Sequence, residues 1–384
     1  MKKMPFRVLF CTNSFQKVEN GPGLFANILK KSLIDDVQHN DELDFRILTE
    51  DIDTSKEQPK VYGIQLKRTE WNKLIYQLIR IYKYYKTSKS IRKQWEFDAV
   101  LYNNAFTGLC SAYFCKSRVL VMINDDNRLA HKSRSFSLSL SYLKSAMLYY
   151  LEKTTARKAD KVIVNSKYLK KIIEKHYELD VDKTMLLYKG VELHPQPPLK
   201  SSSIVNPVNI LFVKNDFHRG GLHTLARSLD LLSGSYNFHL TVVGTSQRDL
   251  ETVTNMLEPY SFTFNLTGII EPKAIANLLS QTDIFCVPSL KEALGVANLE
   301  AMANAVSVVS TRTGGIPEVL DDGKAGWLVE TNNPQELAMA VQECIENDEL
   351  RLQKINYGLQ HVQKFSSENL INNLKKLLIQ KQEA

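Results

Sequence analysis

The stretch from Cys286 to Val329 constrains the fold of this chain most strongly. A run from Asp283 to Val287 has the length and composition of a buried strand, and Pro288-Ser289 ends it. A short loop follows, then a helical pattern over about residues 296–304 and a further strand pattern over 306–310. Buried strands that alternate with helices are typical of an α/β domain with a parallel sheet.

Two glutamates and a glycine lie in this stretch. Glu292 is in the loop, and Glu300 follows eight residues later, inside the predicted helix. Gly295 has no Cβ, so a ligand can approach the backbone there, and the first amides of the helix can receive a phosphate or a hydroxyl. Because carboxylates accept hydrogen bonds from vicinal hydroxyls, the arrangement is typical of polyol binding. The alternative is that neither glutamate binds a ligand: Glu292 would be a solvated loop residue and Glu300 an exposed helix residue.

The same residues resemble the nucleotide-sugar signature of retaining glycosyltransferases of the GT-B architecture, in particular family 4. The resemblance is carried by Pro288-Ser289, Glu292, Gly295, Glu300-Ala301-Met302-Ala303, Gly314-Gly315-Ile316-Pro317-Glu318 and Gly326. It implies that Glu292 contacts the donor sugar and that Glu300 holds the ribose hydroxyls of the nucleotide. It also implies that Leu294, Gly295 and Val296 lie beside the donor.

A pair of cations is expected after the strand predicted over 208–213. Family members usually carry an Arg there and, five residues on, a Lys, and both grip the diphosphate. Lys214 and Arg219 have that spacing with the identities exchanged. This assignment leaves two cations for the charge that develops on the leaving group, although Lys and Arg are not equivalent donors. A second register, which reads residues 217–221 as Phe-x-Arg-Lys-Gly, puts Gly220 in place of the Lys.

The N-terminal half begins with another strand, turn and helix. Residues 7–11 have a buried-strand pattern, Asn20-Gly21-Pro22-Gly23 follows, and helical spacing begins at Phe25. This is the first unit of a Rossmann-like sheet, although the full Gly-x-Gly-x-x-Gly is absent. The resemblance implies that Gly21 and Gly23 face donor phosphate or acceptor.

Asn124 follows a strand predicted over 118–123, where family members usually carry His. An Asn hydrogen-bonds a sugar but does not shuttle a proton. Asp125 and Asp126 either substitute for the His or cap the following segment. Asp51-Ile52-Asp53 imitates the Asp-x-Asp metal motif of a different fold, and we interpret it as an exposed loop.

Length and composition are those of an ordinary globular protein. The 384 residues fit two domains, with 43% hydrophobic and 24% charged residues. No apolar run approaches the roughly 18 residues that span a bilayer. The five cysteines contain no Cys-x-x-Cys and suit a reducing cytoplasm, and the eight histidines have no metal-ligand spacing. We therefore expect a cytoplasmic protein with no metal site, and no motif predicts nucleic-acid binding.

Charge is divided unequally along the chain. Up to Pro195 there are 34 Lys/Arg against 22 Asp/Glu, and after it 15 against 20. The segment from Lys67 to Trp95 holds nine Lys/Arg, six Trp/Tyr and Glu70 as its one acid. It is either a helix with a solvated basic face or a surface for anionic lipid headgroups or a phosphate-linked acceptor, which would make the protein peripheral on the inner face of the membrane.

With the resemblance, the sequence predicts the GT-B α/β fold: two Rossmann-like domains with parallel sheets facing a central cleft, and a C-terminal helix that returns to the first domain. The predicted segments are an acceptor-side domain over 1–194, a linker over 195–207, a nucleotide-sugar domain over 208–365 and the returning helix over 366–384.

The implied activity is metal-independent, retaining transfer of a hexose from a UDP- or GDP-type sugar. The implied acceptor is a glycan or a lipid-linked molecule, as in the synthesis of a cell-surface polysaccharide or lipopolysaccharide, and no cofactor is expected. The alternatives are a catalytically weak relic that binds nucleotide sugars or glycans, and another sugar-nucleotide enzyme such as an epimerase.

Overall fold

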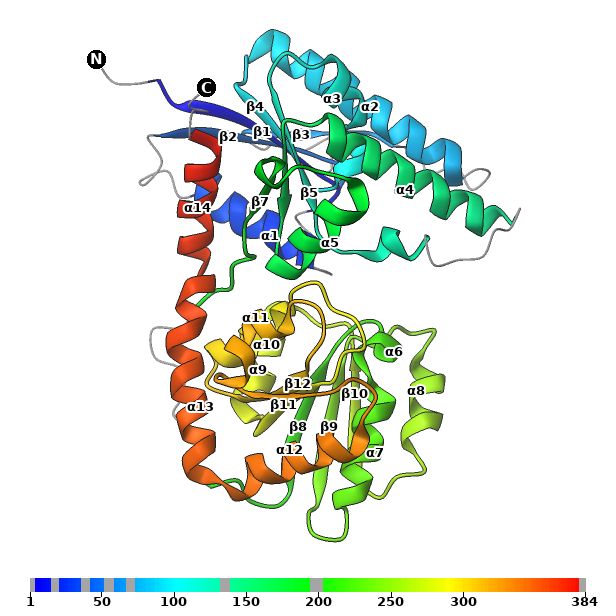
Figure 1. The fold of residues 1–384 in the computed structure, drawn as a ribbon, viewed down its shortest axis with the longest axis vertical. Helices are drawn as coiled ribbons and strands as arrows, with labels where there is room; N and C mark the ends of the chain where they lie inside the picture. Colours follow the sequence, from blue (N-terminus) through cyan, green and yellow to red (C-terminus); the bar gives the residue numbers. More distant parts are fainter. Residues whose placement is uncertain are drawn as a thin grey trace. The chain divides into compact units, whose positions relative to one another are not determined.

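The chain forms two compact units. A computed structural model describes residues 4–14, 21–35, 42–51, 59–66, 73–131, 139–193 and 203–379. The first unit comprises Met1–Tyr188 with Leu370–Ala384, and the second comprises Lys189–Asn369. The divisions therefore fall near residues 188 and 369, against 194 and 365 in the sequence-based prediction. Each unit contains one parallel sheet with helices on both of its faces (Figure 1).

The sheet of the first unit has seven described strands in the order β3-β2-β1-β4-β5-β6-β7. Every neighbouring pair is parallel. The strands are β1 Phe6–Thr12, β2 Leu43–Thr49, β3 Val61–Gly63, β4 Ala99–Tyr102, β5 Arg118–Ile123, β6 Lys161–Val164 and β7 Thr184–Leu186. The helices and helical turns are α1 Gly21–Lys30, η1 Lys31–Asp35, α2 Lys73–Gln94, η3 Ala105–Gly108, α3 Leu109–Phe114, η4 Asn127–His131, α4 Leu140–Lys158, α5 Lys167–Tyr177, η5 Val181–Lys183 and α14 Ser367–Ile379.

Strand β1 shows why this sheet is covered on both sides. Val8 and Phe10 belong to one hydrophobic core, with α1 and α14, and the intervening Leu9 and Cys11 belong to another, with α2, α4 and α5. Successive side chains of a strand point to opposite faces. Because all four are at most 1% exposed, β1 needs helices on both faces, as parallel strands generally do.

The last described helix, α14, completes one of these cores. Leu370, Leu374 and Leu378 recur at four-residue spacing, so they share one helix face, and they pack into the core that holds Val8. Arg118 Nη1 donates a hydrogen bond to the carbonyl oxygen of Leu378 at 2.9 Å. The returning C-terminal helix predicted from the sequence is thus confirmed.

The sheet of the second unit has six described strands, all parallel, in the order β10-β9-β8-β11-β12-β13. The strands are β8 Val208–Val213, β9 Phe238–Val243, β10 Thr263–Gly268, β11 Ile284–Val287, β12 Ser307–Thr311 and β13 Trp327–Val329. The helices and helical turns are α6 Phe217–Gly220, α7 Leu222–Leu232, α8 Leu250–Leu257, α9 Pro272–Gln281, α10 Val296–Ala303, α11 Ile316–Val319, η6 Asp321–Gly323, α12 Pro334–Glu346, α13 Asp348–His361 and η7 Val362–Phe365. The predicted Rossmann-like sheet is confirmed.

Candidate active site

Three loops meet at the carboxyl edge of the second sheet. They follow β8, β11 and β12, which are neighbours in the sheet, so the loops leave it side by side. The amide of Leu290 donates to the carbonyl oxygen of Arg219 at 2.8 Å, and the amide of Gly315 donates to that of Glu292 at 3.3 Å. The loop that carries Glu292 is therefore bonded to both of its neighbours.

Two glycines make this contact between loops sterically possible. Gly314 has φ +58°, and a Cβ there would lie 1.6 Å from the carbonyl oxygen of Glu292. Gly221 has φ +73°, and its Cβ would lie 2.1 Å from the carbonyl oxygen of Pro288. No side chain fits at either distance, and both backbone conformations favour glycine. The glycine motifs and the glutamate loop, separate in sequence, thus form one packed structure.

Lys214 and Glu292 form a salt bridge within this structure. Lys214 Nζ donates to Glu292 Oε2, and each side chain is only 22% exposed. Glu292 Oε1 accepts a hydrogen bond from the amide of Ala293 at 3.0 Å. Glu292 is therefore held in place by a cation and an amide. This differs from the alternative in which its side chain is simply solvated.

Arg219 forms an ion pair with a different acid, Asp216. Its Nε is 3.5 Å from Asp216 Oδ2, and both side chains are about half exposed. The neighbouring Gly220 is buried, and a Cβ there would lie 2.4 Å from Phe212 Cζ. That position has no room for a Lys side chain, so Gly220 serves packing.

Glu300 lies in the second turn of α10 and is only partly exposed. Burial raises the pKa of its carboxyl to about 7. Within the described part of the chain, the carboxylate forms no hydrogen bond or ion pair. Its oxygens are therefore available to donors from a ligand, and hydroxyl donors would favour its charged form.

The backbone at the start of α10 is the other binding element of this edge. Gly295 precedes the helix with φ +94°. The side chain of Leu294 is 1% exposed and lies in the core, so a ligand would meet its backbone. The buried Asn298 Oδ1 and Thr245 Oγ1 have no partner among the described residues. Nothing in their sequence spacing marked these two residues.

In the first unit, side-chain amides connect the carboxyl ends of neighbouring strands. Asn103, Asn124 and Asn165 directly follow β4, β5 and β6. Asn165 Nδ2 donates to the carbonyl oxygen of Asn124 at 2.9 Å, and Asn124 Nδ2 donates to that of Asn103 at 2.6 Å. Asn103 Nδ2 donates to Thr12 Oγ1, at the end of β1, at 3.0 Å. Asn124 is thus one rung of a ladder that spans four strands, and its Oδ1 is buried with no partner in the described residues.

A polar cavity of about 150 Å³ lies beside this ladder. It is lined by Asn13, Pro22, Asn103, Asn104, Met122, Asn124, Asp125, Arg128 and Glu152. Amide and carboxylate groups of this kind suit a ligand rich in hydroxyls. We call it the amide cavity.

Of the other predicted residues, Asp125 lines the amide cavity. Asp125 Oδ1 accepts from the amide of Asn127 at 2.9 Å, so Asp125 caps the turn that follows. Asp126 is buried and Oδ2 accepts from Tyr168 Oη at 3.3 Å. Gly21 and Gly23 lie in the first turn of α1 and not in a turn ahead of it, because the helix begins at Gly21. The predicted glycine turn is therefore the first turn of a helix, and the expected contact of Gly21 and Gly23 with donor phosphate or acceptor stays a prediction.

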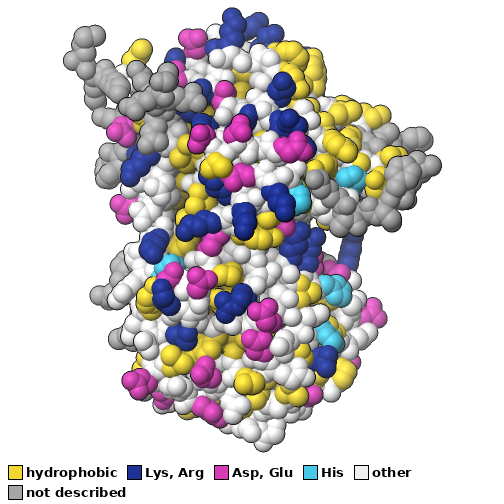
Figure 2. All heavy atoms as spheres, in the orientation of Figure 1, with side chains coloured by type: hydrophobic (Ala, Val, Ile, Leu, Met, Phe, Trp, Pro, Cys, Tyr) yellow, Lys and Arg dark blue, Asp and Glu magenta, His cyan; other side chains and the backbone are white. Residues whose placement is uncertain are grey.

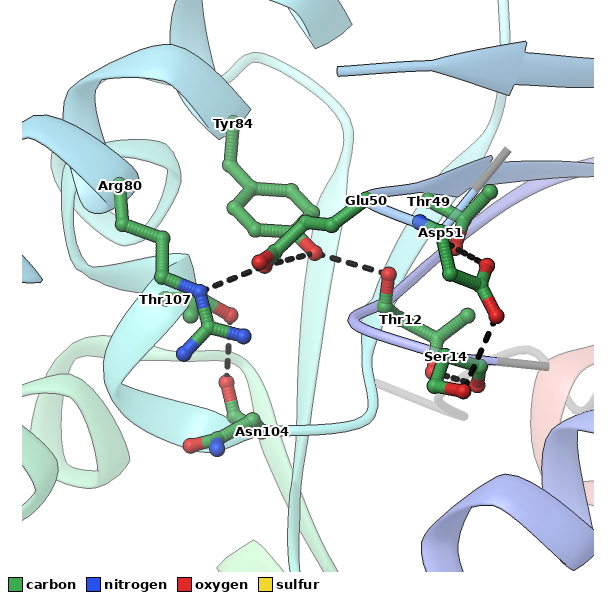
Figure 3. Close-up of polar contacts among 9 residues, drawn as sticks. All are labelled: Thr12, Ser14, Thr49, Glu50, Asp51, Arg80, Tyr84, Asn104 and Thr107. Atoms are coloured by element: carbon green, nitrogen blue, oxygen red, sulfur yellow. Dashed lines mark hydrogen bonds and ion pairs between the residues drawn. The ribbon is translucent and has the colours of Figure 1, made fainter. Parts of the chain in front are cut away.

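A second polar network holds the loops after β1 and β2 (Figure 3). Arg80 Nε donates to Glu50 Oε1 at 2.5 Å, and Tyr84 Oη lies 2.8 Å from both Glu50 Oε1 and the carbonyl oxygen of Thr12. Asp51 Oδ2 accepts from Ser14 Oγ at 3.0 Å, so Asp51 is half-buried and bonded, unlike the exposed residue we predicted. Residues 52 and 53 of that motif lie outside the described residues. In the described ranges, no three His, Cys, Asp or Glu are grouped to hold a metal ion.

Comparison with known proteins identifies the family. Residues 200–361 match the family model for glycosyl transferases group 1, and residues 39–194 match that for glycosyltransferase family 4. The chain is a GT-B glycosyltransferase of the family 4 type. The predicted family and fold class are confirmed.

Individual relatives of this glycosyltransferase are distant. An uncharacterised glycosyltransferase of Methanocaldococcus jannaschii is 25% identical over 346 residues, which cover 88% of this chain and 90% of the relative. A glycosyltransferase of Escherichia coli K12 named for colanic acid biosynthesis is 29% identical over 174 residues, 42% of each chain. The crystal structure of an Anabaena protein with UDP-glucose shares the fold, with a TM-score of 0.72 and 16% identity over 97% of this chain and 99% of that one.

Proposed function

We propose that this glycosyltransferase moves a hexose from a UDP- or GDP-type sugar to a glycan or lipid-linked acceptor, with retention of configuration and without a metal ion. The observation that carries the proposal is the carboxyl edge of the second sheet. There Lys214 is paired with Glu292, and the carboxylate of Glu300 has no partner among the described residues. A relative in colanic acid biosynthesis and a structural neighbour with UDP-glucose support a polysaccharide pathway and a UDP sugar.

Each residue has a distinct part in this proposal. The Glu300 carboxylate accepts from the ribose hydroxyls. Lys214 exchanges its bond to Glu292 for the diphosphate, and Glu292 is then released toward the sugar hydroxyls. Arg219, in the short helix α6 that follows Lys214, adds a second cation as negative charge develops on the leaving group.

Calorimetry with UDP, GDP and ADP tests the nucleotide site. Hydroxyl donors favour the charged carboxylate, so a bound ribose lowers the pKa of Glu300 from about 7 and expels a proton. At pH 6 we expect UDP or GDP to release up to about one proton on binding, measured in two buffers of different ionisation enthalpy. E300Q should bind about tenfold more weakly, as expected for loss of a charge-assisted hydrogen bond. It should also release fewer protons than the wild type, because only the terminal phosphate of the nucleotide, whose second pKa is near 6, then loses protons on binding.

Matched controls make this test specific. E349Q, at an exposed position of α13, should bind and release protons like the wild type. Equal nucleotide affinity in wild type and E300Q would contradict the assignment of Glu300. Retention and metal independence need separate measurements: NMR of the anomeric configuration of the product, and transfer rates in excess EDTA.

We also propose that the protein works in the cytoplasm, peripherally on the inner face of the membrane. On α2, Ile75, Leu78, Ile79 and Tyr82 are 51, 49, 43 and 55% exposed, and they share one helix face with the exposed Lys83, Lys86 and Lys89. We call these seven residues the α2 surface. Figure 2 shows hydrophobic side chains gathered over the part of the first unit that contains α2 to α4. Apolar side chains beside lysines suit the headgroup region of an anionic bilayer. Among the described helices, none is long and apolar enough to cross a membrane.

A further inference from the structure

A second cavity lies next to the amide cavity, between η4 and α4. Its volume is about 240 Å³, and it is lined by Asn127, Arg128, Ser141, Lys144, Ser145 and Leu148. Two of these side chains are cations and two are hydroxyls. None of the described lining residues is acidic. We call it the basic cavity.

Arg128 is held rigidly at the wall of this cavity. Its Nε donates to Glu152 Oε2 at 2.5 Å, and its guanidinium carbon lies 4.8 Å from the centre of the Phe106 ring. Glu152 is itself buried and accepts from Tyr177 Oη at 2.7 Å. No described residue accepts a hydrogen bond from the two Nη groups of Arg128. They remain as a fixed pair of donors, which matches the oxygens of a phosphate.

Helix α4 supplies the opposite wall. Ser141, Lys144, Ser145 and Leu148 are spaced at three and four residues, so they lie on one face of the helix. Lys144 is half-buried and forms no ion pair with any described residue. The cavity therefore combines one cation without a counter-charge, the donors of Arg128 and two hydroxyls.

The two cavities differ in the charge they accept. Asp125 and Glu152 line the amide cavity, so an anion is disfavoured there and hydroxyls are suited. The basic cavity lacks such carboxylates among its described residues. Arg128 lines both cavities, so they share one wall. One ligand with hydroxyls at one end and an oxyanion at the other would fill both.

We propose that the basic cavity binds a phosphate group of the acceptor, with Arg128 and Lys144 as its cationic ligands and Ser141 and Ser145 as hydroxyl donors. This site rests on the proposed transferase function and narrows its acceptor to a phosphorylated one. The phosphate belongs either to a soluble sugar phosphate or to the link between a sugar and a lipid.

Phosphate binding can be measured directly on the full chain. Inorganic phosphate is titrated at constant ionic strength, with the tightest-binding nucleoside diphosphate present in excess to occupy the other anion site. We expect K144Q and the double variant S141A/S145A each to weaken phosphate binding, K144Q by about tenfold, as for loss of one charge-assisted hydrogen bond. K144R should restore binding in part. K171Q, which removes the same charge from an exposed position of α5, should bind phosphate like the wild type.

Acceptor kinetics give a second, independent readout. The ratio of kcat/KM for a sugar 1-phosphate to that for the same unphosphorylated sugar should fall about tenfold in K144Q and stay constant in K171Q. The same pair of sugars with and without a lipid on the phosphate separates the two sources: a preference for the lipid-linked form assigns the site to a lipid-linked acceptor. If wild type and K144Q bind phosphate equally and both still bind nucleotide, the phosphate site in the basic cavity is overturned, while the transferase proposal stands. If the wild-type protein binds no nucleoside diphosphate, the transferase proposal itself is overturned.

Discussion

Glu300 carries a carboxyl whose surroundings oppose its ionisation. Its pKa of about 7 in the folded protein lies above the value near 4.5 of an unperturbed glutamate. Because burial favours the neutral form, the protonated Glu300 carboxyl stabilises the folded protein relative to the charged form. This contribution to the free energy of unfolding is fully present below about pH 4.5 and is lost as the pH rises through 7. A shift of this size corresponds to about 3 kcal/mol at most.

We therefore expect E300Q to gain stability relative to the wild type as the pH rises. The difference in unfolding free energy should move in favour of E300Q by up to about 3 kcal/mol between pH 4.5 and 8. Urea denaturation at several pH values measures it. E349Q, at an exposed site, should follow the wild type throughout. Parallel pH profiles for E300Q and wild type would show that Glu300 ionises without cost.

At the scale of single residues, the sequence identified candidate site residues but not their contacts. Glu292 and Lys214 were both predicted from the family motif, yet their salt bridge joins residues 78 positions apart and depends on how three loops pack. Arg128 and Lys144 were not predicted, because an arginine in a turn and a lysine on a helix are ordinary in sequence. Their role depends on a shared cavity.

At the scale of elements, strands were more predictable than helix starts. Asp283 to Val287 was predicted as a strand, and Ile284–Val287 forms one. The helix after the first strand begins at Gly21, so Pro22 lies in its first turn. Proline is tolerated there because the amide groups of the first turn have no intrahelical acceptor. The asparagine ladder had a visible signal, an Asn directly after each of three strands. The order of those strands in the sheet, which makes the ladder, cannot be read from the spacing.

The ladder predicts a graded loss of stability on substitution. Asn165 is 3% exposed, and N165A removes its donor and leaves the carbonyl oxygen of Asn124 unpaired, so we expect a loss of about 1–3 kcal/mol. N165D should lose more at neutral pH, because it puts a buried charge beside that oxygen. Urea denaturation measures both. N372A, on the exposed side of α14, is the control and should not destabilise. An N165D protein as stable as the wild type would contradict the ladder.

At the scale of the whole molecule, the proposed role of the α2 surface is to attach the enzyme to an anionic bilayer. Each basic residue near an anionic bilayer contributes on the order of 1 kcal/mol. We expect co-sedimentation with anionic but not neutral liposomes, weakened by salt, and about a hundredfold weaker binding for K83E/K86E/K89E. K167E/K171E/K175E reverses three exposed lysines of α5 and should bind like the wild type. If the wild type fails to bind anionic liposomes at low ionic strength, the α2 lysines form a solvated face and the acceptor is soluble.

The position of the α14 leucines in the sequence determines which unit can complete its core first during translation. The core behind Val8 is closed by Leu370, Leu374 and Leu378, which leave the ribosome about 180 residues after the last strand of their sheet. At roughly 5–20 residues per second, that separation lasts on the order of 10–40 s. During this interval one face of the first sheet has no cover from α14, while the uninterrupted stretch 189–369 already contains every strand of the second sheet. The half of the enzyme that is translated first is thus the half that matures last.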